Sequence, residues 1–398
     1  MKAATKLIVL LAAGTLGAWS APASAQGTGR SMDFDLSIRS AGMGGASNAV
    51  VWGHGLDHWG NPALLGAERG VSYEWTRTQL VPELANDVIL RTDVIKLAQG
   101  GAGVVISGRP FGAGVHLDYG ESEGTDQSGN PTGMFASFEK VKSWGFGANL
   151  LETFESVTQL PGRSGNPLSR YFDVGFGMNF KHLDMFLGPG GGAGSTSALD
   201  WGTTVRVTPI DLVSRDGTPV RLDASFGLSV LSANDDALVV FLNEDQASPV
   251  SRHHRNGVAL HLSADPAAGR SNERETWSWF QRGLSPLLAF TAASDRDRIT
   301  AGSFGGGYNT SGEGAELAFA NVASVRYGHY HDRLGDIDGA TWGAGIGMPF
   351  GKFAGVRYDF ARIPQASGFK SLSRHGASAW FDPVELMRAS RSNRPKSL

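Results

Sequence analysis

Residues 172–181 read FDVGFGMNFK, and their side chains alternate strictly between two kinds. Phe, Val, Phe, Met and Phe occupy one set of alternate positions, and Asp, Gly, Gly, Asn and Lys occupy the other. Successive side chains of a β-strand point to opposite faces. The segment therefore predicts a strand with one apolar face and one small or polar face.

The same period of two recurs through most of the chain after residue 71. It is clearest in the ranges 144–150, 222–230, 258–263, 342–350 and 356–360. Further segments lie at 71–79, 86–96, 101–109, 112–120, 199–208, 284–293, 298–306, 315–331 and 374–382. A soluble sandwich or propeller would also have one apolar strand face. These segments, however, run to about 9–12 residues, whereas soluble strands usually have about 5–6, and the greater length suits a tilted crossing of a bilayer.

Aromatic residues near the predicted strand ends favour the membrane alternative, because interfacial girdles of aromatics flank membrane spans. The candidates are Tyr119, Trp144, Trp201, Tyr358 and Trp380. We predict an all-β fold, a transmembrane antiparallel β-barrel of about fourteen strands within a range of about twelve to sixteen. A closed sheet leaves no unpaired edge, so we expect a monomer surrounded by outer-membrane lipid.

The composition excludes several functional classes. The chain has no cysteine, which removes thiolate metal sites and cysteine nucleophiles. A net charge of −3 argues against a nucleic-acid partner. After residue 25 no run of about 18 apolar residues occurs, so membrane-spanning helices are not expected. No Gly-x-Ser-x-Gly or His-Glu-x-x-His motif appears. We expect no enzyme activity, no cofactor and no metal site.

The first residues have the three parts of an export signal. Lys2 and Lys6 precede an apolar stretch, and residues 23–25 form a small-x-small cleavage site. The apolar stretch is too short for the alternative, a membrane anchor. We expect residues 1–25 to be a cleaved signal peptide, 26–70 an N-terminal segment, 71–382 the barrel and 383–398 a basic periplasmic tail, in a Gram-negative outer membrane.

Two Pro-Phe-Gly sequences predict tight turns on the periplasmic side, at residues 109–112 and 348–352. Longer polar loops are predicted at 120–131, 188–197, 243–256, 265–275 and 362–373. The loops carry groups that resemble binding motifs, namely His253-His254, the glycines of 188–194, and Asp332, Asp336 and Asp338. Each lacks the spacing or partners of a known site, so we interpret them as solvated loops.

Charged residues on the polar strand faces are predicted to form a network of ion pairs inside the lumen. They are Asp118, Asp173, Lys181, Asp200, Arg206, Asp223, Arg357 and Asp359.

Residues 26–70 do not alternate and contain two short motifs. The first includes Gly42, Met43, Gly44 and Gly45, and ends at Ala46; the second is Asn61, Pro62 and Ala63. The glycines suit close backbone approach, and Asn61-Pro62 predicts a helix cap followed by proline at the first helical position.

This pair of motifs, between a signal peptide and alternating strands, resembles the FadL-like outer-membrane superfamily, which includes PorV/PorQ-type barrels. The resemblance implies a fourteen-stranded barrel with its N-terminal segment folded inside as a hatch, and a structural or gating role for the two motifs. It also implies transport of small hydrophobic molecules such as fatty acids, with release through a gap in the wall. The alternative implied by PorV-type members is a role in protein secretion or surface attachment, with secreted proteins as partners.

Overall fold

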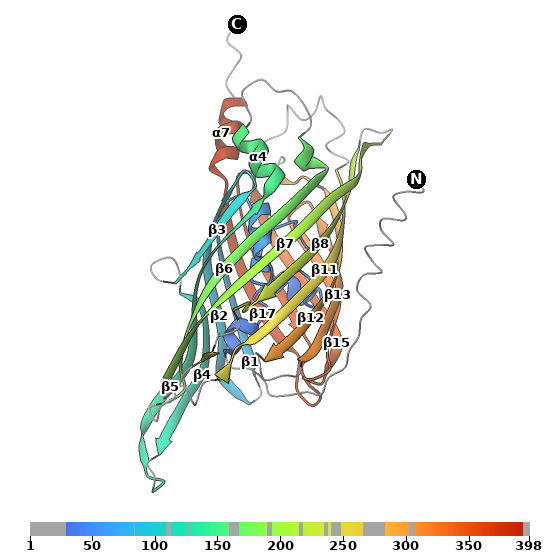
Figure 1. The fold of residues 1–398 in the computed structure, drawn as a ribbon. Helices are drawn as coiled ribbons and strands as arrows, with labels where there is room; N and C mark the ends of the chain where they lie inside the picture. Colours follow the sequence, from blue (N-terminus) through green and yellow to red (C-terminus); the bar gives the residue numbers. More distant parts are fainter. Residues whose placement is uncertain are drawn as a thin grey trace.

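The computed structural model consists largely of long β-strands (Figure 1). It describes residues 29–82, 84–108, 113–125, 128–158, 167–188, 193–214, 218–234, 238–239, 248–265, 283–301 and 307–392. The predicted signal peptide lies outside these residues. The wall strands are β1 (Gly70–Val81), β2 (Ala85–Gln99), β3 (Ala102–Ser107), β4 (Gly114–Thr125), β5 (Pro131–Asn149), β6 (Phe172–Phe186), β7 (Ala193–Val213), β8 (Pro219–Leu231), β11 (Ser251–Ala264), β12 (Leu288–Ala301), β13 (Gly307–Phe319), β14 (Ala323–Asp332), β15 (Ile337–Phe350), β16 (Ala354–Ile363) and β17 (Leu372–Phe381). Two short strands, β9 (Leu238–Val239) and β10 (Ser248–Pro249), pair only with each other.

The wall closes because β1 pairs with both β2 and β17, all antiparallel. β3 and β4 both pair with β2 on one side and with β5 on the other, so together they occupy one position. The fifteen strands of the sheet therefore fill fourteen positions. The predicted closed antiparallel barrel of about fourteen strands is confirmed.

The prediction of a hairpin at residues 109–112 is wrong. These four residues lie outside the described part of the chain, but β3 and β4 on either side of them run in the same direction between the same neighbours. The strand in this position is thus interrupted in sequence between Ser107 and Gly114, although pairing with β5 passes from Ser107–Ser143 to Val115–Val141 with only Lys142 between. The second Pro-Phe-Gly sequence does join a hairpin, between β15 and β16.

The apolar face of the strands points outward and the small or polar face points into the lumen. On β15, Trp342, Ile346 and Met348 are 46%, 65% and 54% exposed, while Gly343 and Gly345 between them are buried. On β11, Val258 and Leu260 are similarly exposed. Such an arrangement is stable only where lipid covers the outside, because a closed barrel pairs its backbone groups within the wall.

Three residues face the other way from the prediction. Asp118 points outward beside His116, because its neighbour Leu117 is buried in the lumen. Tyr119 and Trp380 point inward rather than forming an outer girdle. The hydroxyl of Tyr119 donates to Glu139, and the ring of Trp380 stacks on a histidine of the chain inside.

Residues 29–69, the lumenal segment, lie inside the barrel, as their contacts with strands on opposite sides of the wall show. The segment contains α2 (Arg30–Asp33), α3 (Ile38–Gly42), η1 (Asp57–Trp59) and η2 (Pro62–Ala67). The predicted cap is confirmed: the Asn61 side chain accepts from the Ala63 backbone N–H at 3.2 Å, and Pro62 begins the helix, which is of the 3-10 type.

The two ends of the barrel differ. β1 begins and β17 ends at the same end, where Val71 pairs with Phe381; we call it the terminal end. It also carries α4 (Leu150–Thr158), η3 (Leu168–Arg170) and α7 (Pro383–Ser392), with α4 and α7 at the top of Figure 1. We call the opposite end, where β4 and β5 extend furthest, the distal end. β11 ends at the terminal end of the barrel. The predicted loop 265–275, which lies largely outside the described residues, therefore begins at the terminal end, whereas the other predicted long loops belong to the distal end. Within the described residues no helix combines the length and apolarity needed to cross a membrane.

Candidate functional site

Glycines of the wall let the Gly42–Gly45 motif approach the strands at backbone distance. A Cβ on Gly312 would lie 1.8 Å from the Gly44 carbonyl oxygen, and a Cβ on Gly328 would lie 2.4 Å from the Met43 carbonyl carbon. Gly44 itself has a φ of 72°, in the left-handed region that favours glycine. Thr341 of β15 completes the contact, because its hydroxyl accepts from the Gly44 N–H at 2.9 Å. The glycine-rich inner faces of β13 to β15 are therefore the seat of this motif.

The Asn61–Pro62–Ala63 motif has a second glycine seat on another part of the wall. A Cβ on Gly177 of β6 would lie 2.4 Å from the Pro62 carbonyl carbon, and one on Gly202 of β7 would lie 2.0 Å from the Asn61 side-chain oxygen. The Asn61 amide also donates to the Asn48 carbonyl at 2.7 Å, within the lumenal segment. The structure thus fixes the two predicted motifs at different places on the inner wall.

Carboxylates of the wall also bind the lumenal segment at positions outside the two glycine seats. Glu139 on β5 accepts from the backbone N–H and the hydroxyl of Ser31 at 2.8 and 2.6 Å. Asp295 on β12 accepts from the backbone N–H groups of Ser47 and Asn48 at 2.8 and 2.7 Å. Glu139 and Asp295 are 1% and 4% exposed, so these bonds form away from solvent.

The predicted network of inward charges is largely present, as buried ion pairs. Lys181 and Asp200, 1% and 0% exposed, are 2.7 Å apart, and the Lys181 ammonium also lies 3.7 Å from the centre of the Trp59 ring. Further inward pairs are Arg221–Asp223, Arg357–Asp359, Arg326–Asp359 and Arg326–Glu316, and Glu316 also pairs with Arg39 of the lumenal segment. Three predicted members form no inward ion pair with a described residue. Asp118 faces outward, Asp173 accepts from the Leu151 and Glu152 N–H groups, and Arg206 donates to the Ser169 carbonyl.

Burial also sets the protonation of the lumenal segment itself. Removal from water raises the pKa of Asp57 to about 6 and lowers the pKa of His58 to about 3. Burial alone would raise the pKa of Glu68, but the Lys96 ammonium, 2.6 Å away, lowers it to about 2. His58 is therefore neutral at pH 7 and Glu68 is ionised. Across the described ranges no three His, Asp or Glu side chains are grouped so as to hold a metal ion.

One side of the lumen is apolar. Met32, Leu36 and Trp59 of the lumenal segment pack with inward-facing side chains of β2 to β7. We call this group the apolar cluster; its other buried members are Leu56, Leu65, Leu90, Val94, Val105, Val115, Leu117, Val141, Leu183, Met185, Ala198 and Val250. Val105 lies two residues before the end of β3, and Val115 and Leu117 lie at the start of β4, so the cluster lies behind the interruption between the two strands.

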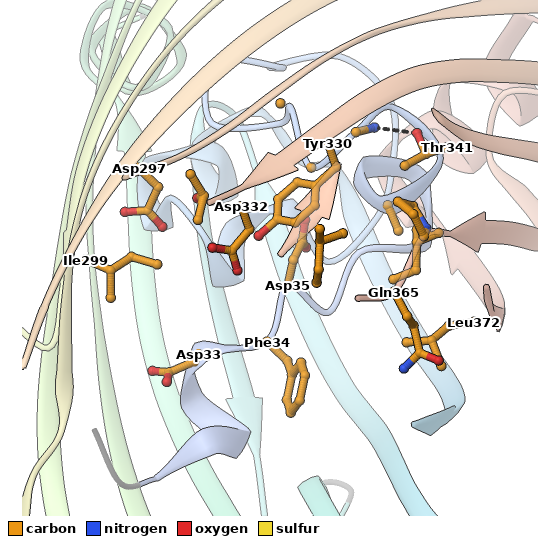
Figure 2. A pocket seen from close by; sticks show the side chains of 18 of the residues that line it. Asp33, Phe34, Asp35, Asp297, Ile299, Tyr330, Asp332, Thr341, Gln365 and Leu372 are labelled. Carbon is orange, nitrogen blue, oxygen red and sulfur yellow. Dashed lines mark hydrogen bonds between the residues drawn. The ribbon is translucent and has the colours of Figure 1, made fainter. Parts of the chain in front are cut away.

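A pocket of about 600 Å³ opens on the distal side of the lumenal segment. Figure 2 shows Phe34 projecting into it, with Asp33 and Asp297 on one side of the ring and Gln365 and Leu372 on the other. Met32 and Trp59 belong both to the pocket lining and to the apolar cluster, so the two regions adjoin.

Sequence reasoning missed most of this pocket. His253 was expected in an exposed loop, but it lies on β11 with its ring 5% exposed and contacts Asp297 and Asp33 at 2.7 and 3.3 Å. Asp332 was expected in a solvated loop and instead lines the pocket. The sequence does contain the alternation of a strand here, with His253, Arg255 and Gly257 on one face and His254, Val258 and Leu260 on the other. Charged residues on both faces near His254 made this alternation hard to recognise.

Valine in place of Gly312 is expected to unseat the lumenal segment, because the Gly44 carbonyl is a backbone group that cannot rotate away. We expect the G312V barrel to remain folded and to conduct ions more readily than the wild type in planar bilayers. Ala315→Val is the matched control, since Ala315 lies on the same strand and faces outward. Equal conductance of G312V and the wild type would contradict the seat.

Comparisons with solved structures return outer-membrane barrels. The toluene transporter TbuX of Ralstonia pickettii is 14% identical, with 86% of this chain and 96% of that chain covered and a TM-score of 0.39. The toluene transporter TodX of Pseudomonas putida is also 14% identical, with the same coverage and a TM-score of 0.37. An anion-selective porin from Comamonas acidovorans is 11% identical over 78% of this chain and 96% of that chain, with a TM-score of 0.30. No family model and no curated protein matches the sequence.

The fold and the distribution of side chains place the chain in a membrane independently of these likenesses. Fourteen wall positions close without a free edge, and large apolar side chains cover the outside. Closed β-barrels with this outer surface are structures of bacterial outer membranes. The chain is an outer-membrane β-barrel whose lumen contains its own N-terminal segment.

Proposed function

We propose that the barrel is a conduit for small hydrophobic molecules across the outer membrane, and that it acts as a monomer without catalysis. The observation that carries the proposal is the apolar cluster. The inward faces of most outer-membrane barrels are polar, because water fills or lines them. Here a continuous set of buried apolar side chains leads from the pocket to the interrupted wall position between β3 and β4.

A route through this side of the lumen suits an apolar solute and excludes ions. A hydrophobic molecule that leaves water gains about 25 cal/mol for each Å² of apolar surface it buries, whereas a hydrated ion loses its water along such a path. An exit into lipid would open at this interruption, and β3 or β4 would have to shift, because Ser107 and Val115 still pair with Ser143 and Val141 of β5. Short turns of such barrels face the periplasm, and the short turn between β15 and β16 lies at the terminal end. In this orientation the pocket would face the cell exterior, and the molecule would enter at the distal end and leave sideways.

Movement of the lumenal segment is part of the proposal. Met32, Leu36 and Trp59 fill the apolar cluster in the resting structure, and each is at most 3% exposed. The Ser31–Glu139 hydrogen bonds hold α2 against β5 beside this cluster. Passage therefore requires α2 and its neighbours to shift, while the two glycine seats fix the rest of the segment.

Uptake by cells tests the proposal, because intact lipopolysaccharide slows the entry of apolar solutes. We expect a Gram-negative host expressing the barrel to take up labelled propylbenzene faster than the host with empty vector. Leu117→Asn puts an amide into the apolar cluster and is expected to slow uptake at least about fivefold, since an unpaired amide costs about 1–3 kcal/mol in apolar surroundings.

Val50→Asn is the matched control. Val50 is also buried in the lumen, at 4% exposure, but it packs in a separate group with Met43 and Ala46 against β11 and β12. It should leave uptake near the wild-type rate. Propylbenzene uptake equal to that of the empty vector, with the folded barrel present in the membrane, would exclude the proposed conduit.

A further inference from the structure

The pocket on the distal side combines apolar walls with an unusual set of charges. Its volume of about 600 Å³ is in the range of small-molecule sites, which have about 300–1,000 Å³. Phe34, Tyr330 and Leu372 provide aromatic and aliphatic surface from the lumenal segment, β14 and β17. A molecule with a ring or a short alkyl chain therefore has apolar surface to contact on several sides.

Carboxylates outnumber cations in the lining. Five carboxylates face three guanidinium groups and one imidazole: Asp33, Asp35, Asp295, Asp297 and Asp332 against Arg30, Arg255, Arg374 and His253. Three of the cations are engaged by carboxylates, and Arg374 donates to neutral acceptors, the Thr78 hydroxyl at 3.1 Å and the Asp35 carbonyl at 2.5 Å. Arg255 lies 3.4 Å from Asp295, Arg30 lies 3.3 Å from Asp33, and His253 lies between Asp33 and Asp297.

Two carboxylates, Asp35 and Asp332, form no ion pair within 4 Å among the described residues. Asp35 accepts from the Ser37 N–H at 2.9 Å and from the Ser40 hydroxyl at 2.5 Å. Asp332 accepts from the backbone N–H groups of Leu334 and Gly335, both at 3.0 Å. These neutral donors hold the two side chains in place without cancelling their charge. Figure 2 shows both carboxylates near the Tyr330 ring, at the centre of the pocket.

Two buried donors of the lining, the Trp59 indole N–H and the Arg255 Nε–H, have no acceptor among the described residues. Trp59 is 2% exposed. A hydroxyl group can both donate to a carboxylate and accept from an indole N–H. An alcohol or phenol thus matches the polar groups of the pocket better than a plain hydrocarbon does.

We propose that this pocket selects hydrophobic molecules with a hydrogen-bond-donating head, a hydroxyl or an ammonium group, and rejects molecules whose head is a carboxylate. The inference rests on the proposed conduit and narrows its substrate class. A carboxylate would meet the unpaired charges of Asp35 and Asp332, whereas Arg255 is held by Asp295 and Arg374 by the Asp35 carbonyl. Like charges repel more strongly where water is partly excluded. An ammonium group would instead be attracted by both carboxylates and by the face of an aromatic ring. This selection would favour alcohols and amines over the fatty acids that the resemblance implied.

Binding of four matched probes tests the selection. Phenylpropanol, phenylpropylamine, phenylpropanoate and propylbenzene share one apolar body and differ only in the head group. We would measure their binding to the full barrel in nanodiscs at pH 7 by equilibrium dialysis, with empty nanodiscs subtracted. The alcohol and the amine are expected to bind at least about tenfold more tightly than the carboxylate, which corresponds to one lost charge interaction.

Variants test whether Asp35 and Asp332 cause the difference in affinity between the amine and the carboxylate probes. The double variant D35N/D332N keeps acceptors for the local N–H and hydroxyl donors, and it should reduce the ratio of amine to carboxylate affinity about tenfold. Asp338→Asn removes one negative charge on the neighbouring strand outside the pocket, where the side chain is 65% exposed, and should leave the ratio unchanged. A ratio that does not respond to D35N/D332N would overturn the assignment.

The outcomes separate this inference from the proposed conduit. Phenylpropanoate bound as tightly as phenylpropanol would overturn the selection, whether or not cells take up propylbenzene. Discrimination among the probes in nanodiscs without faster uptake by cells would support the selection and remove the conduit.

Discussion

Deletion of residues 29–69 is expected to convert the barrel into an open, ion-conducting pore. The segment occupies the lumen from the glycine seat on β13 to β15 to the second seat on β6 and β7, so its removal leaves a cross-section wide enough for water. Wall carboxylates such as Glu139, Asp295 and Glu316 would lose their partners in the segment but would gain water. In planar bilayers we expect single-channel conductance to rise more than about tenfold, since wide barrels without a plug are aqueous channels.

A second deletion controls for damage to the wall. α7 follows the last wall strand and lies at the terminal end, so removal of residues 383–392 should leave conductance at the wild-type level. Should the barrel lacking 29–69 fail to fold, the same segment added back as a separate peptide provides a second measurement, because it should restore folding and then block the current. Wild-type conductance in a folded barrel that lacks the segment would contradict a plugging role.

The alternation of side chains predicted the wall because membrane and lumen impose it on every strand. Residues 172–181 show this, since each apolar position of that stretch points outward and each small or polar position points inward. Some glycines of the inner face also have a packing role, which the alternation of side chains alone could not predict. Gly177 and Gly312 are small because the backbone of the lumenal segment passes against them, and only the three-dimensional seat reveals which glycines have that role.

The errors arose where a local signal competed with the pairing of whole strands. Pro110 and Gly112 are typical turn residues, yet the strands around them continue in one direction because both pair with β2 and β5. His253 was assigned to a loop because charges surround it, whereas in the barrel its ring lies between Asp297 of the neighbouring strand and Asp33 of the lumenal segment. Neither long-range pairing nor long-range charge neutralisation is encoded within a few residues of sequence.

Methionine in place of Lys181 is expected to destabilise the barrel more than any other single substitution discussed above. The ammonium is the ion partner of Asp200 at 2.7 Å, and both side chains are at most 1% exposed. Removal of one partner leaves a buried, uncompensated charge, which costs about 3–5 kcal/mol. The Trp59 ring also loses the cation 3.7 Å from its centre. The free energy of unfolding in lipid vesicles, from urea titration followed by tryptophan fluorescence, should fall by about this amount.

Two comparisons show whether the loss comes from the buried charge. Arg69→Met breaks an ion pair of similar length, 2.8 Å to Glu152, but it lies at the terminal end with Arg69 58% exposed and should cost about 0–1 kcal/mol. Adding Asp200→Asn to Lys181→Met removes the unpaired charge and keeps the hydrogen bond from the Ser232 N–H, so most of the stability should return. If the double variant were as unstable as Lys181→Met alone, the packing of the lysine chain, rather than its charge, would hold β6 and β7 to the lumenal segment.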